Sequence, residues 1–371
     1  MNETLSAVKQ AVAAAGPAEK TMDQEALHRI LKAANFEEPD RVPIWDFVDS
    51  WPIYQIFAPG DTDPVTATAK VFHGLGIDLC RSVYLPVSPE EEEGPASQQF
   101  HGCTRWAQWC IRSAEELRAY EVPRITEQQA WEWVVEYCRQ RDIFAPNTLL
   151  VPCDGVGFHA TYGLMGIEQF SYALYESFED IRRIVEAWND NAVMRAQAFA
   201  EARPGPLYFL GDDIAFKGRA MFSPKIMHTL FYPYLERLCG ILRPAGIKVI
   251  FHTDGYVMDI VADLVAAGID GLNPIEPLAG NDIGELKRRY GDRLILVGNV
   301  DCSQTLPLGT VEDVRRAVRE CLLAAAAGGG HFIGSSSEIV PATPVENILA
   351  FYQACREYGR YPIGTGWEGE G

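Results

Sequence analysis

Near residue 250, the sequence holds an imidazole and carboxylates at a spacing that could serve chemistry. Between Ile247 and Glu276 the chain reads IKVIFHTDGYVMDIVADLVAAGIDGLNPIE, in which His252 and Asp254 follow one apolar run and Glu276 follows another. An imidazole beside carboxylates suits either a divalent metal ion or general acid–base catalysis. The stretch therefore predicts a polar site, provided that the fold brings these three side chains together.

The pattern around these residues is that of a strand, a helix and a second strand. Apolar residues predominate over 247–251, recur at helical spacing over 257–265, and predominate again in the short run 269–275. In parallel α/β folds the functional side chains gather at the carboxyl ends of the strands. We therefore expect His252, Asp254 and Glu276 to lie at two neighbouring strand ends.

The same pattern over the whole chain predicts a (β/α)8 barrel. Strands are expected near residues 44, 80, 150, 208, 249, 271, 296 and 332, each followed by a helix. A doubly wound sheet is the alternative, and it is disfavoured because no Gly-rich phosphate-binding turn follows a strand. We expect a single barrel domain over residues 1–371, with helices within 1–40 and an inserted loop region at 86–125 that includes a candidate β-hairpin at 100–111.

Further polar residues follow the other predicted strands. They are Asp46, Asp154, Asp212, Asp213, Asn299, Asp301 and Glu338. The competing interpretation is that most of these carboxylates cap helices or bind nearby backbone. The remaining histidines are expected to be structural, with His159 the least certain because it lies near the third strand end.

Composition restricts the classes of partner. The net charge is −19 and the sequence pI is about 4.8, which argues against a nucleic-acid groove and an anionic membrane surface. The nine cysteines include no C-x-x-C pair, as expected for reduced thiols in a cytoplasmic protein. Neither a transmembrane segment nor a signal peptide is expected.

Several segments resemble the uroporphyrinogen decarboxylase superfamily. They are ALHRILKAANFEEPDRVPIWD, GDDIAFKGRAMFSPKIMHTLFYPYLERL, KVIFHTDGYV, AGIDGLNPIEP, LILVGNVDCSQTLPLGTVEDVRR and PATPVENILAF, in that order. The resemblance implies the same (β/α)8 barrel. True uroporphyrinogen decarboxylases carry an Arg-rich motif after the first strand, whereas this chain reads WDFVDSWPIYQ there. Decarboxylation of a porphyrinogen is therefore disfavoured.

The other branch that the chain resembles contains corrinoid-linked methyltransferases. Members that act on thiols carry H-x-C-G, whereas this chain has His252-Thr253-Asp254-Gly255, and Ser337 or a neighbour stands near a second family cysteine. The H-x-D-G form resembles methyltransferases that demethylate ethers such as methoxylated aromatics. The resemblance implies catalysis by His252, Asp254 and Glu276 with Asp213 nearby, and a zinc held by His252, Asp254 and Glu276 is one form that this site could take.

The resemblance also implies a partner, because these enzymes pass the methyl group to the cobalt of a separate corrinoid protein. No D-x-H-x-x-G run for a cobalt ligand occurs in this chain. Around the mouth, an apolar substrate pocket is expected from the residues Trp45, Trp51, Tyr54, Phe158, Tyr162 and Phe216, for which ordinary packing is the alternative. Asn299 is a further candidate for binding the substrate. Lys217 could bind a substrate carboxylate or pair with Asp212 or Asp213.

Other functions stay open at this point. One is a decarboxylase or lyase of the same superfamily that acts on an unknown acid. Another is a barrel that binds a small ligand without catalysis. The region at 86–125 could shape the docking of the corrinoid protein or a contact in a homodimer.

Overall fold

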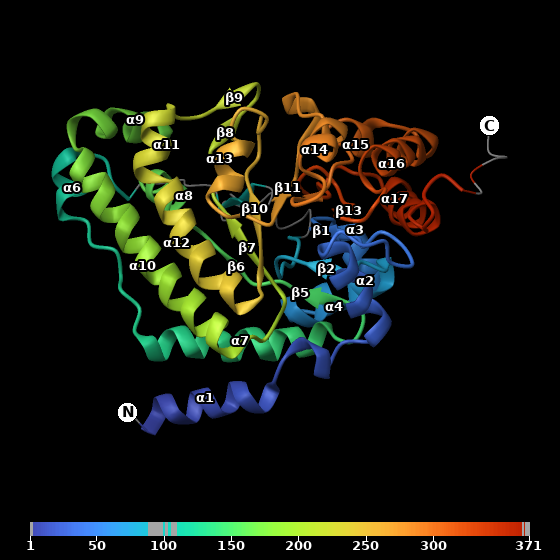
Figure 1. Ribbon diagram of the computed structural model, residues 1–371, viewed down its shortest axis with the longest axis horizontal. Helices are drawn as coiled ribbons and strands as arrows, with labels where there is room; N and C mark the ends of the chain where they lie inside the picture. Colours follow the sequence, from blue (N-terminus) through green and yellow to red (C-terminus); the bar gives the residue numbers. More distant parts are fainter. Residues whose placement is uncertain (1–2, 88–98, 101–102, 105–109, 366, 368–371) are drawn as a thin grey trace.

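The computed structural model describes residues 3–87, 99–100, 103–104, 110–365 and 367. Short parallel strands lie at all eight positions that the sequence predicts (Figure 1). The strands are β1 (Trp45–Asp46), β2 (Leu79–Cys80), β5 (Leu149–Leu150), β6 (Cys153–Asp154), β7 (Leu207–Gly211), β10 (Lys248–His252), β11 (Gly271–Asn273), β12 (Ile295–Val297) and β13 (His331–Phe332). The third predicted strand consists of two pieces, β5 and β6. Pro152 lies between them and has no backbone N–H to donate.

The strands close into a barrel. In one direction β5 pairs with β2 and β6 pairs with β7, so the third strand joins two sheets of order β1-β2-β5 and β13-β12-β11-β10-β7-β6. On the other side Trp45 N donates to Ile333 O at 2.9 Å, and Ile333 N donates to Pro43 O at 2.9 Å. These bonds join β1 to β13, so the predicted (β/α)8 fold is confirmed.

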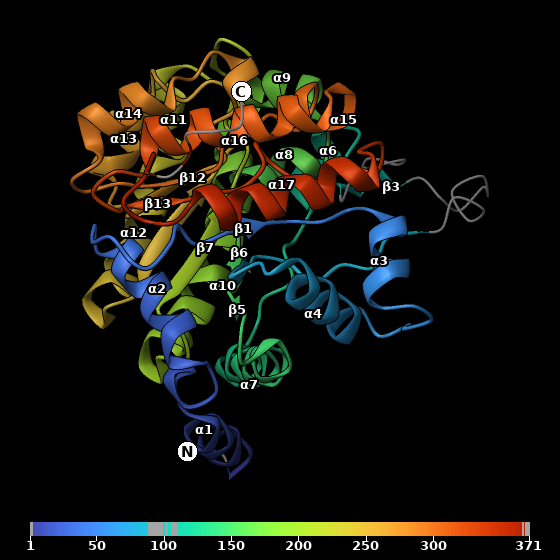
Figure 2. The same cartoon turned by 90° about the vertical axis from the view of Figure 1, so that its right-hand side faces the viewer.

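Helices surround the barrel (Figures 1 and 2). They are α1 (Glu3–Ala15), α2 (Gln24–Ala34), α3 (Trp51–Phe57), α4 (Pro64–Leu75), α6 (Ala114–Ala119), α7 (Glu127–Phe144), α8 (Phe158–Gly163), α9 (Ile167–Glu176), α10 (Phe178–Ala202), α11 (Pro224–Leu230), α12 (Tyr232–Leu242), α13 (Val261–Ala266), α14 (Ile283–Tyr290), α15 (Thr305–Leu308), α16 (Val311–Ala325) and α17 (Val345–Tyr358), with short 3-10 turns η1 (Ala18–Lys20), η2 (Arg243–Ala245) and η3 (Pro277–Ala279).

The sequence predicts one helix over 223–242, and the structure instead has α11 and α12. The predicted N-cap is present, because the Ser223 hydroxyl accepts from Ile226 N. The break falls at Phe231, which leaves the helical conformation. Pro233 explains the break, because its ring lacks an N–H and is tolerated only in the first turn of a new helix.

Two apolar cores lie on either side of the strands. The inner one fills the barrel with alternate strand residues such as Trp45, Phe209, Ile250 and Phe332, and α2 packs against it with Ile30. The outer core lies between strands and helices. Because strand side chains alternate between the two faces, β2, β5, β7, β10 and β12 contribute to both cores.

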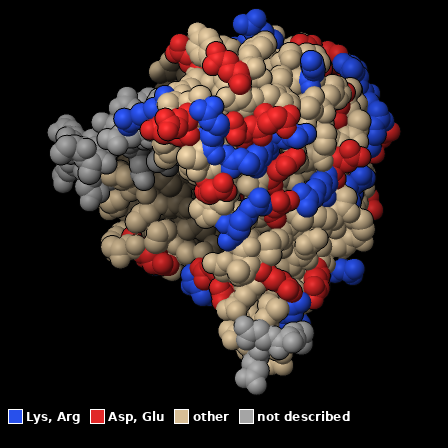
Figure 3. Space-filling model, turned by 90° about the vertical axis from the view of Figure 1, so that its left-hand side faces the viewer, with Lys and Arg blue, Asp and Glu red and all other residues tan. Residues whose placement is uncertain are grey.

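Beyond the barrel, two small antiparallel pairs are present. β3 (Gln99–Phe100) pairs with β4 (Cys103–Thr104) inside the predicted hairpin region, whose Trp106 and Trp109 lie outside the described residues. β8 (Ala215–Phe216) pairs with β9 (Arg219–Ala220). Acidic and basic side chains are interspersed on the face of the molecule in Figure 3. On α10, Arg182 pairs with Glu179, and Asp190 pairs with Arg237 of α12. Among the described residues, none of the helices has both the length and the apolar character needed to cross a bilayer.

Candidate active site

His252 is the last residue of β10, and Asp254 lies two residues further along, in the polar loop that follows. His252 pairs in register with Gly211 of β7 and with Asn273 of β11. The next residue, Thr253, accepts Ile214 N at its hydroxyl, at 3.0 Å. Gly255 then turns the chain with a φ of +92°, and a Cβ at this position would lie 2.5 Å from the Ala215 carbonyl carbon. Only glycine fits this conformation and this close approach, so the His-x-Asp-Gly sequence has a local structural cause.

Three ligand-type side chains converge at this loop. One ligand atom each from Asp213, His252 and Asp254 lies within 4.8 Å of the others. His252 Nε2 lies 3.7 Å from Asp213 Oδ1 and 3.7 Å from Asp254 Oδ1. Asp254 N donates to Asp213 Oδ1 at 3.1 Å, which ties the two loops together. Asp254 Oδ1 is buried and has no hydrogen-bond partner. A buried carboxylate oxygen without a partner is costly, so the arrangement favours a cation here.

Asn273 orients the imidazole. Its Oδ1 lies 2.7 Å from His252 Nδ1, and the Asn273 side chain is buried. Because a side-chain carbonyl oxygen can only accept, Nδ1 carries the proton and the lone pair of Nε2 faces the two aspartates. A hydrogen bond from one ring nitrogen to an acceptor such as Asn273 holds the imidazole so that its other nitrogen can bind a metal.

Glu276 lies close enough to this cluster to interact with Asp254 and Asp213, but it is not one of the three residues whose ligand atoms converge. The loop that carries it is fixed by Asn281, whose Nδ2 donates to Glu276 O at 2.9 Å and to Gly255 O at 2.8 Å. Burial, the nearby carboxylates of Asp254 and Asp213 and a hydrogen bond with the Asp254 side chain together raise the pKa of Glu276 to about 7, against the opposing effect of a backbone hydrogen bond from Gly255. Glu276 is therefore partly protonated near pH 7 and could deliver its proton to a leaving group. The geometry favours Asp213 over Glu276 as the third ligand.

His159 completes the wall beside Asp213. Its ring stacks on Tyr162 with centroids 4.5 Å apart, and its Nδ1 lies 3.5 Å from Asp213 Oδ2. The Tyr162 hydroxyl donates to Asp213 O at 3.0 Å. Burial lowers the pKa of His159, against the opposing effect of Asp213. The sequence predicts a structural histidine here, and the position of His159 after the third strand is the signal that points to a site residue.

On the opposite side of the mouth, Arg81 and Glu338 form a second polar group. Arg81 follows β2, and its Nη2 donates to Ser337 O at 3.2 Å. Burial raises the pKa of Glu338 to about 7; Arg81 lowers it and the nearby Asp49 and Asp254 raise it. Arg81 is not among the candidates predicted from the sequence, which are mainly acids, amides and imidazoles at the strand ends. Inspection of basic residues at the same positions would have found it.

Other carboxylates at the strand ends have structural roles. Asp46 accepts from Ser335 and from the Tyr352 hydroxyl, Asp154 pairs with Arg195 at 2.6 Å, Asp212 accepts from Phe158 N, and Asp301 accepts from the backbone of Gln304 and Thr305. The competing interpretation, that most of these carboxylates cap helices or bind nearby backbone, fits Asp301, and it fits Asp46 and Asp154, which accept from Phe47 N and Gly155 N.

The predicted pocket residues are dispersed. Trp45 lies inside the barrel with its ring centroid 5.6 Å from that of Phe209, and so forms part of the floor below His252. Tyr54 and Phe158 are fully packed, and the Tyr54 hydroxyl donates to Tyr84 O. Trp51 is half-buried in α3. These positions favour packing for Tyr54, Phe158 and Trp45, which lies in the floor, and leave Tyr162 beside the cluster.

Three remaining candidates lie at or near the rim. Phe216 is 63% exposed, and Lys217 is exposed at the β8–β9 turn. In the described part of the chain, Lys217 makes no ion pair with Asp212 or Asp213. Asn299 Nδ2 donates to Ile275 O at 2.9 Å, so it supports the loop before Glu276.

Known proteins resemble this chain at the level of sequence and fold. A model of the family described as uroporphyrinogen decarboxylase (URO-D) matches residues 107–358. The Methylcobamide:CoM methyltransferase MtaA of Methanosarcina barkeri is 26% identical over 197 residues, which are 53% of this chain and 54% of that protein. A uroporphyrinogen decarboxylase of Coxiella burnetii is 35% identical over 146 residues, 37% of this chain and 38% of that protein. The chain thus spans about half the length, or less, of these curated relatives.

A solved structure supports the fold. A methyltransferase from Methanosarcina mazei matches with a TM-score of 0.66 at 20% identity, and the match covers 89% of this chain and 98% of that one. Because the family model covers more than half of its length, the chain belongs to the uroporphyrinogen decarboxylase (URO-D) family.

Proposed function

We propose that the protein moves a methyl group from a methoxylated aromatic substrate to the cobalt of a separate corrinoid protein. The observation that carries this proposal is the cluster of Asp213, His252 and Asp254, with ligand atoms within 4.8 Å of one another. The similarity of the chain to a methylcobamide methyltransferase adds support. The ligand set contains oxygen and nitrogen atoms but no thiolate, so it suits the activation of an ether better than that of a thiol.

The cluster fits a zinc ion. Three ligands leave the open position that a catalytic zinc requires. The buried Asp254 Oδ1 lacks a partner, and His252 presents Nε2 because Asn273 accepts from Nδ1. When bound, a zinc ion would supply Lewis acidity to the ether oxygen.

The side chains of this protein would do the remaining work. In the transfer, the O–CH3 bond breaks and the methyl group bonds to the cobalt of the partner, which as Co(I) supplies the electron pair of the new bond and becomes Co(III). The electron pair of the broken bond stays on the ether oxygen, where a proton from Glu276 would neutralise it. In the metal-free protein burial raises the pKa of Glu276 to about 7, so a protonated form is available near neutral pH. Trp45 and Phe209 close the floor and keep water away from below.

The rim beside the cluster suits a partner protein. Phe216 is 63% exposed and Leu278 is 52% exposed. Their loops are linked, because Gly218 N donates to Ala279 O at 3.3 Å. Exposed apolar side chains grouped next to a site are typical of a protein contact. A corrinoid protein that docks here would bring its cobalt over the cluster.

The alternative function is decarboxylation of a small acid, to which the similarity with uroporphyrinogen decarboxylases points. The two functions give different products. A decarboxylase releases CO2 without any corrinoid, whereas a methyltransferase needs cob(I)alamin and releases a demethylated product.

The test is methyl transfer with purified, zinc-supplemented protein. We would incubate it with free cob(I)alamin and a panel of methoxylated arenes, and follow methylcob(III)alamin by its absorbance. Product is expected with at least one methoxyarene, and Asp254→Asn should reduce its rate by about a thousandfold. Absence of methylcobalamin with every donor would contradict the proposal. Release of CO2 from acids without cobalamin would favour the alternative, and neither product would favour a ligand-binding barrel.

A further inference from the structure

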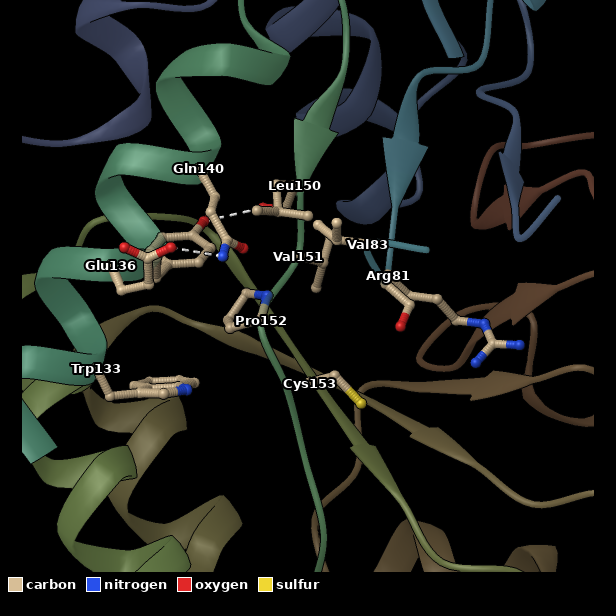
Figure 4. A pocket seen from close by; sticks show the side chains of 11 residues that line it. Arg81, Val83, Trp133, Glu136, Gln140, Leu150, Val151, Pro152 and Cys153 are labelled. Atoms are coloured by element: carbon tan, nitrogen blue, oxygen red, sulfur yellow. Dashed lines mark hydrogen bonds between the residues drawn. The ribbon is translucent and has the colours of Figure 1, made fainter. Parts of the chain in front are cut away.

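Arg81 occupies an unusual position in the mouth of the barrel. Its guanidinium carbon lies 5.1 Å from the ring centroid of Phe47 and 5.5 Å from that of Phe209. Two aromatic neighbours hold the flat guanidinium in one orientation and leave its edge free for hydrogen bonds. Figure 4 shows the side chain pointing away from Glu136 and Gln140 of α7. The orientation is therefore fixed in advance of any ligand.

The hydrogen-bonding capacity of Arg81 is mostly unused. A guanidinium has five N–H donors, and the bond that Arg81 makes within the described part of the chain goes to Ser337 O at 3.2 Å. Within the described ranges, no carboxylate oxygen lies within ion-pair distance of it, whereas the part-buried Arg41 and Arg195 pair with Asp78 at 2.7 Å and Asp154 at 2.6 Å. A partly buried arginine with unused donors and a fixed orientation is suited to an anionic ligand.

This arginine and the cluster share one aromatic neighbour. The Phe209 ring centroid lies 5.5 Å from the Arg81 guanidinium carbon and 5.5 Å from the His252 ring centroid. The two groups are thus no more than twice that distance apart. A single small molecule could contact both groups, with its anionic end at Arg81 and its reacting end at the cluster.

Charge selects the kind of anion. Glu338 lies close enough to feel both Arg81 and Asp254, and Asp49 and Asp46 act on it as well. A dianion such as a phosphate ester would meet these acids with only one cation to balance it. A carboxylate carries a single charge and matches the two-pronged edge of a guanidinium.

We propose that Arg81 binds the carboxylate of the substrate, so that the methyl donor is a small methoxylated carboxylic acid. This inference rests on the proposed function for the methyl transfer at the cluster. The binding of a carboxylate by Arg81 does not depend on that function. Lys217, the cation that the sequence suggested for this role, is exposed on the β8–β9 turn. Arg81 is better placed, because it is partly buried and oriented by Phe47 and Phe209.

The experiment compares an acid with a neutral analogue. Zinc-loaded wild type, Arg81→Met and Arg81→Lys would be titrated with 4-methoxybenzoate and with 4-methoxybenzyl alcohol, by calorimetry for binding and with cob(I)alamin for turnover. Arg81→Met should weaken binding of the benzoate by about 30-fold or more and leave that of the alcohol within about twofold. Arg81→Lys should fall between, because lysine keeps the charge but not the two-pronged geometry. Arg288→Met, on the exposed face of α14, is the matched control and should change neither.

The outcomes separate binding from chemistry. Arg81-dependent binding of the benzoate without methyl transfer would support this inference and contradict the proposed function. Methyl transfer from 4-methoxybenzyl alcohol, together with binding of the benzoate that Arg81→Met does not weaken, would support the proposed function and contradict this inference. Equal weakening of both ligands, a loss of preference in Lys217→Met instead, or no binding of the benzoate by wild type would each overturn the role of Arg81. Circular dichroism and the melting temperature would check that each variant is folded.

Discussion

The floor and the mouth of the barrel are built by the same strands and differ by a step of two residues. On β10, Ile250 lies in the inner core and His252 lies in the cluster. On β2, Leu79 lies in the inner core and Arg81 follows at the mouth. Because alternate strand residues share a face, a shift of two residues keeps the side chain inside the barrel and moves it from the apolar floor to the polar mouth.

This difference assigns stability and chemistry to separate layers. In the floor, residues are fully buried and apolar, and their side chains pack against one another. In the mouth, Asp254 Oδ1 lacks a partner and burial raises the pKa of Glu276 to about 7. Groups with unmet needs of this kind gather at sites where a ligand or metal will satisfy them. Variants in the floor should therefore change stability, and variants in the mouth should change binding.

The largest expected effect on stability lies in the floor. Ile295→Ala, on β12, should lower the free energy of unfolding by about 2–5 kcal/mol, because it leaves a cavity in a fully buried layer. Denaturant unfolding would measure this, and Ile295→Val should cost only about 1 kcal/mol. Zinc affinity of the folded fraction should not change. If folded Ile295→Ala lost its zinc affinity, the separation of the two layers would be wrong.

A mouth residue should show the opposite behaviour. Asn273→Leu removes the acceptor of His252 Nδ1 and should weaken zinc binding by about 10- to 100-fold, because the imidazole loses its orientation. Competition with a chromophoric chelator would measure the affinity. Asn191→Leu is the control, since this buried asparagine binds Pro123 O and Ile125 N instead. Equal zinc affinities in wild type and Asn273→Leu would contradict an orienting role.

A smaller effect is expected at a histidine outside both layers. His331 is fully buried, and its Nε2 lies 2.8 Å from Gly298 O. Burial lowers its pKa from 6.5 to about 4. The unfolded state therefore binds the proton first as the pH falls below 6.5, and stability is lost. Between pH 7.5 and pH 5 wild type should lose about 2 kcal/mol more than His331→Gln. If the unfolding free energies of wild type and His331→Gln fell by the same amount over this pH range, His331 would not be buried in its neutral form.

The sequence was sufficient for the positions of the strands but not for the identity of every ligand. The eight strands and the loop from His252 to Gly255 follow from periodicity and local glycine geometry. The choice of Asp213 over Glu276 in the cluster depends on the loop after β7, where Asp213 Oδ1 accepts from Asp254 N. That contact joins residues far apart in the chain, and no local pattern specifies it.

Arg81 and His159 illustrate the same limit. Both follow predicted strands, but their roles depend on neighbours from other strands and helices, namely Phe209 for Arg81 and Asp213 for His159. In the same way, Tyr54 and Phe158 are aromatic residues of the kind that lines pockets, and only the packing of α3 and α8 shows that they are buried. Residue type indicated candidates, and tertiary contacts selected among them.

The proposed chemistry depends on whether Asp213, His252 and Asp254 bind a zinc ion. Equilibrium zinc titration of the metal-free protein tests it directly. Wild type is expected to bind about one zinc ion per chain, and His252→Ala, Asp213→Ala and Asp254→Ala should each weaken the affinity by about a hundredfold or more, with a smaller effect for Glu276→Ala. Failure of wild type to bind zinc, or an unchanged affinity in His252→Ala, would contradict the account.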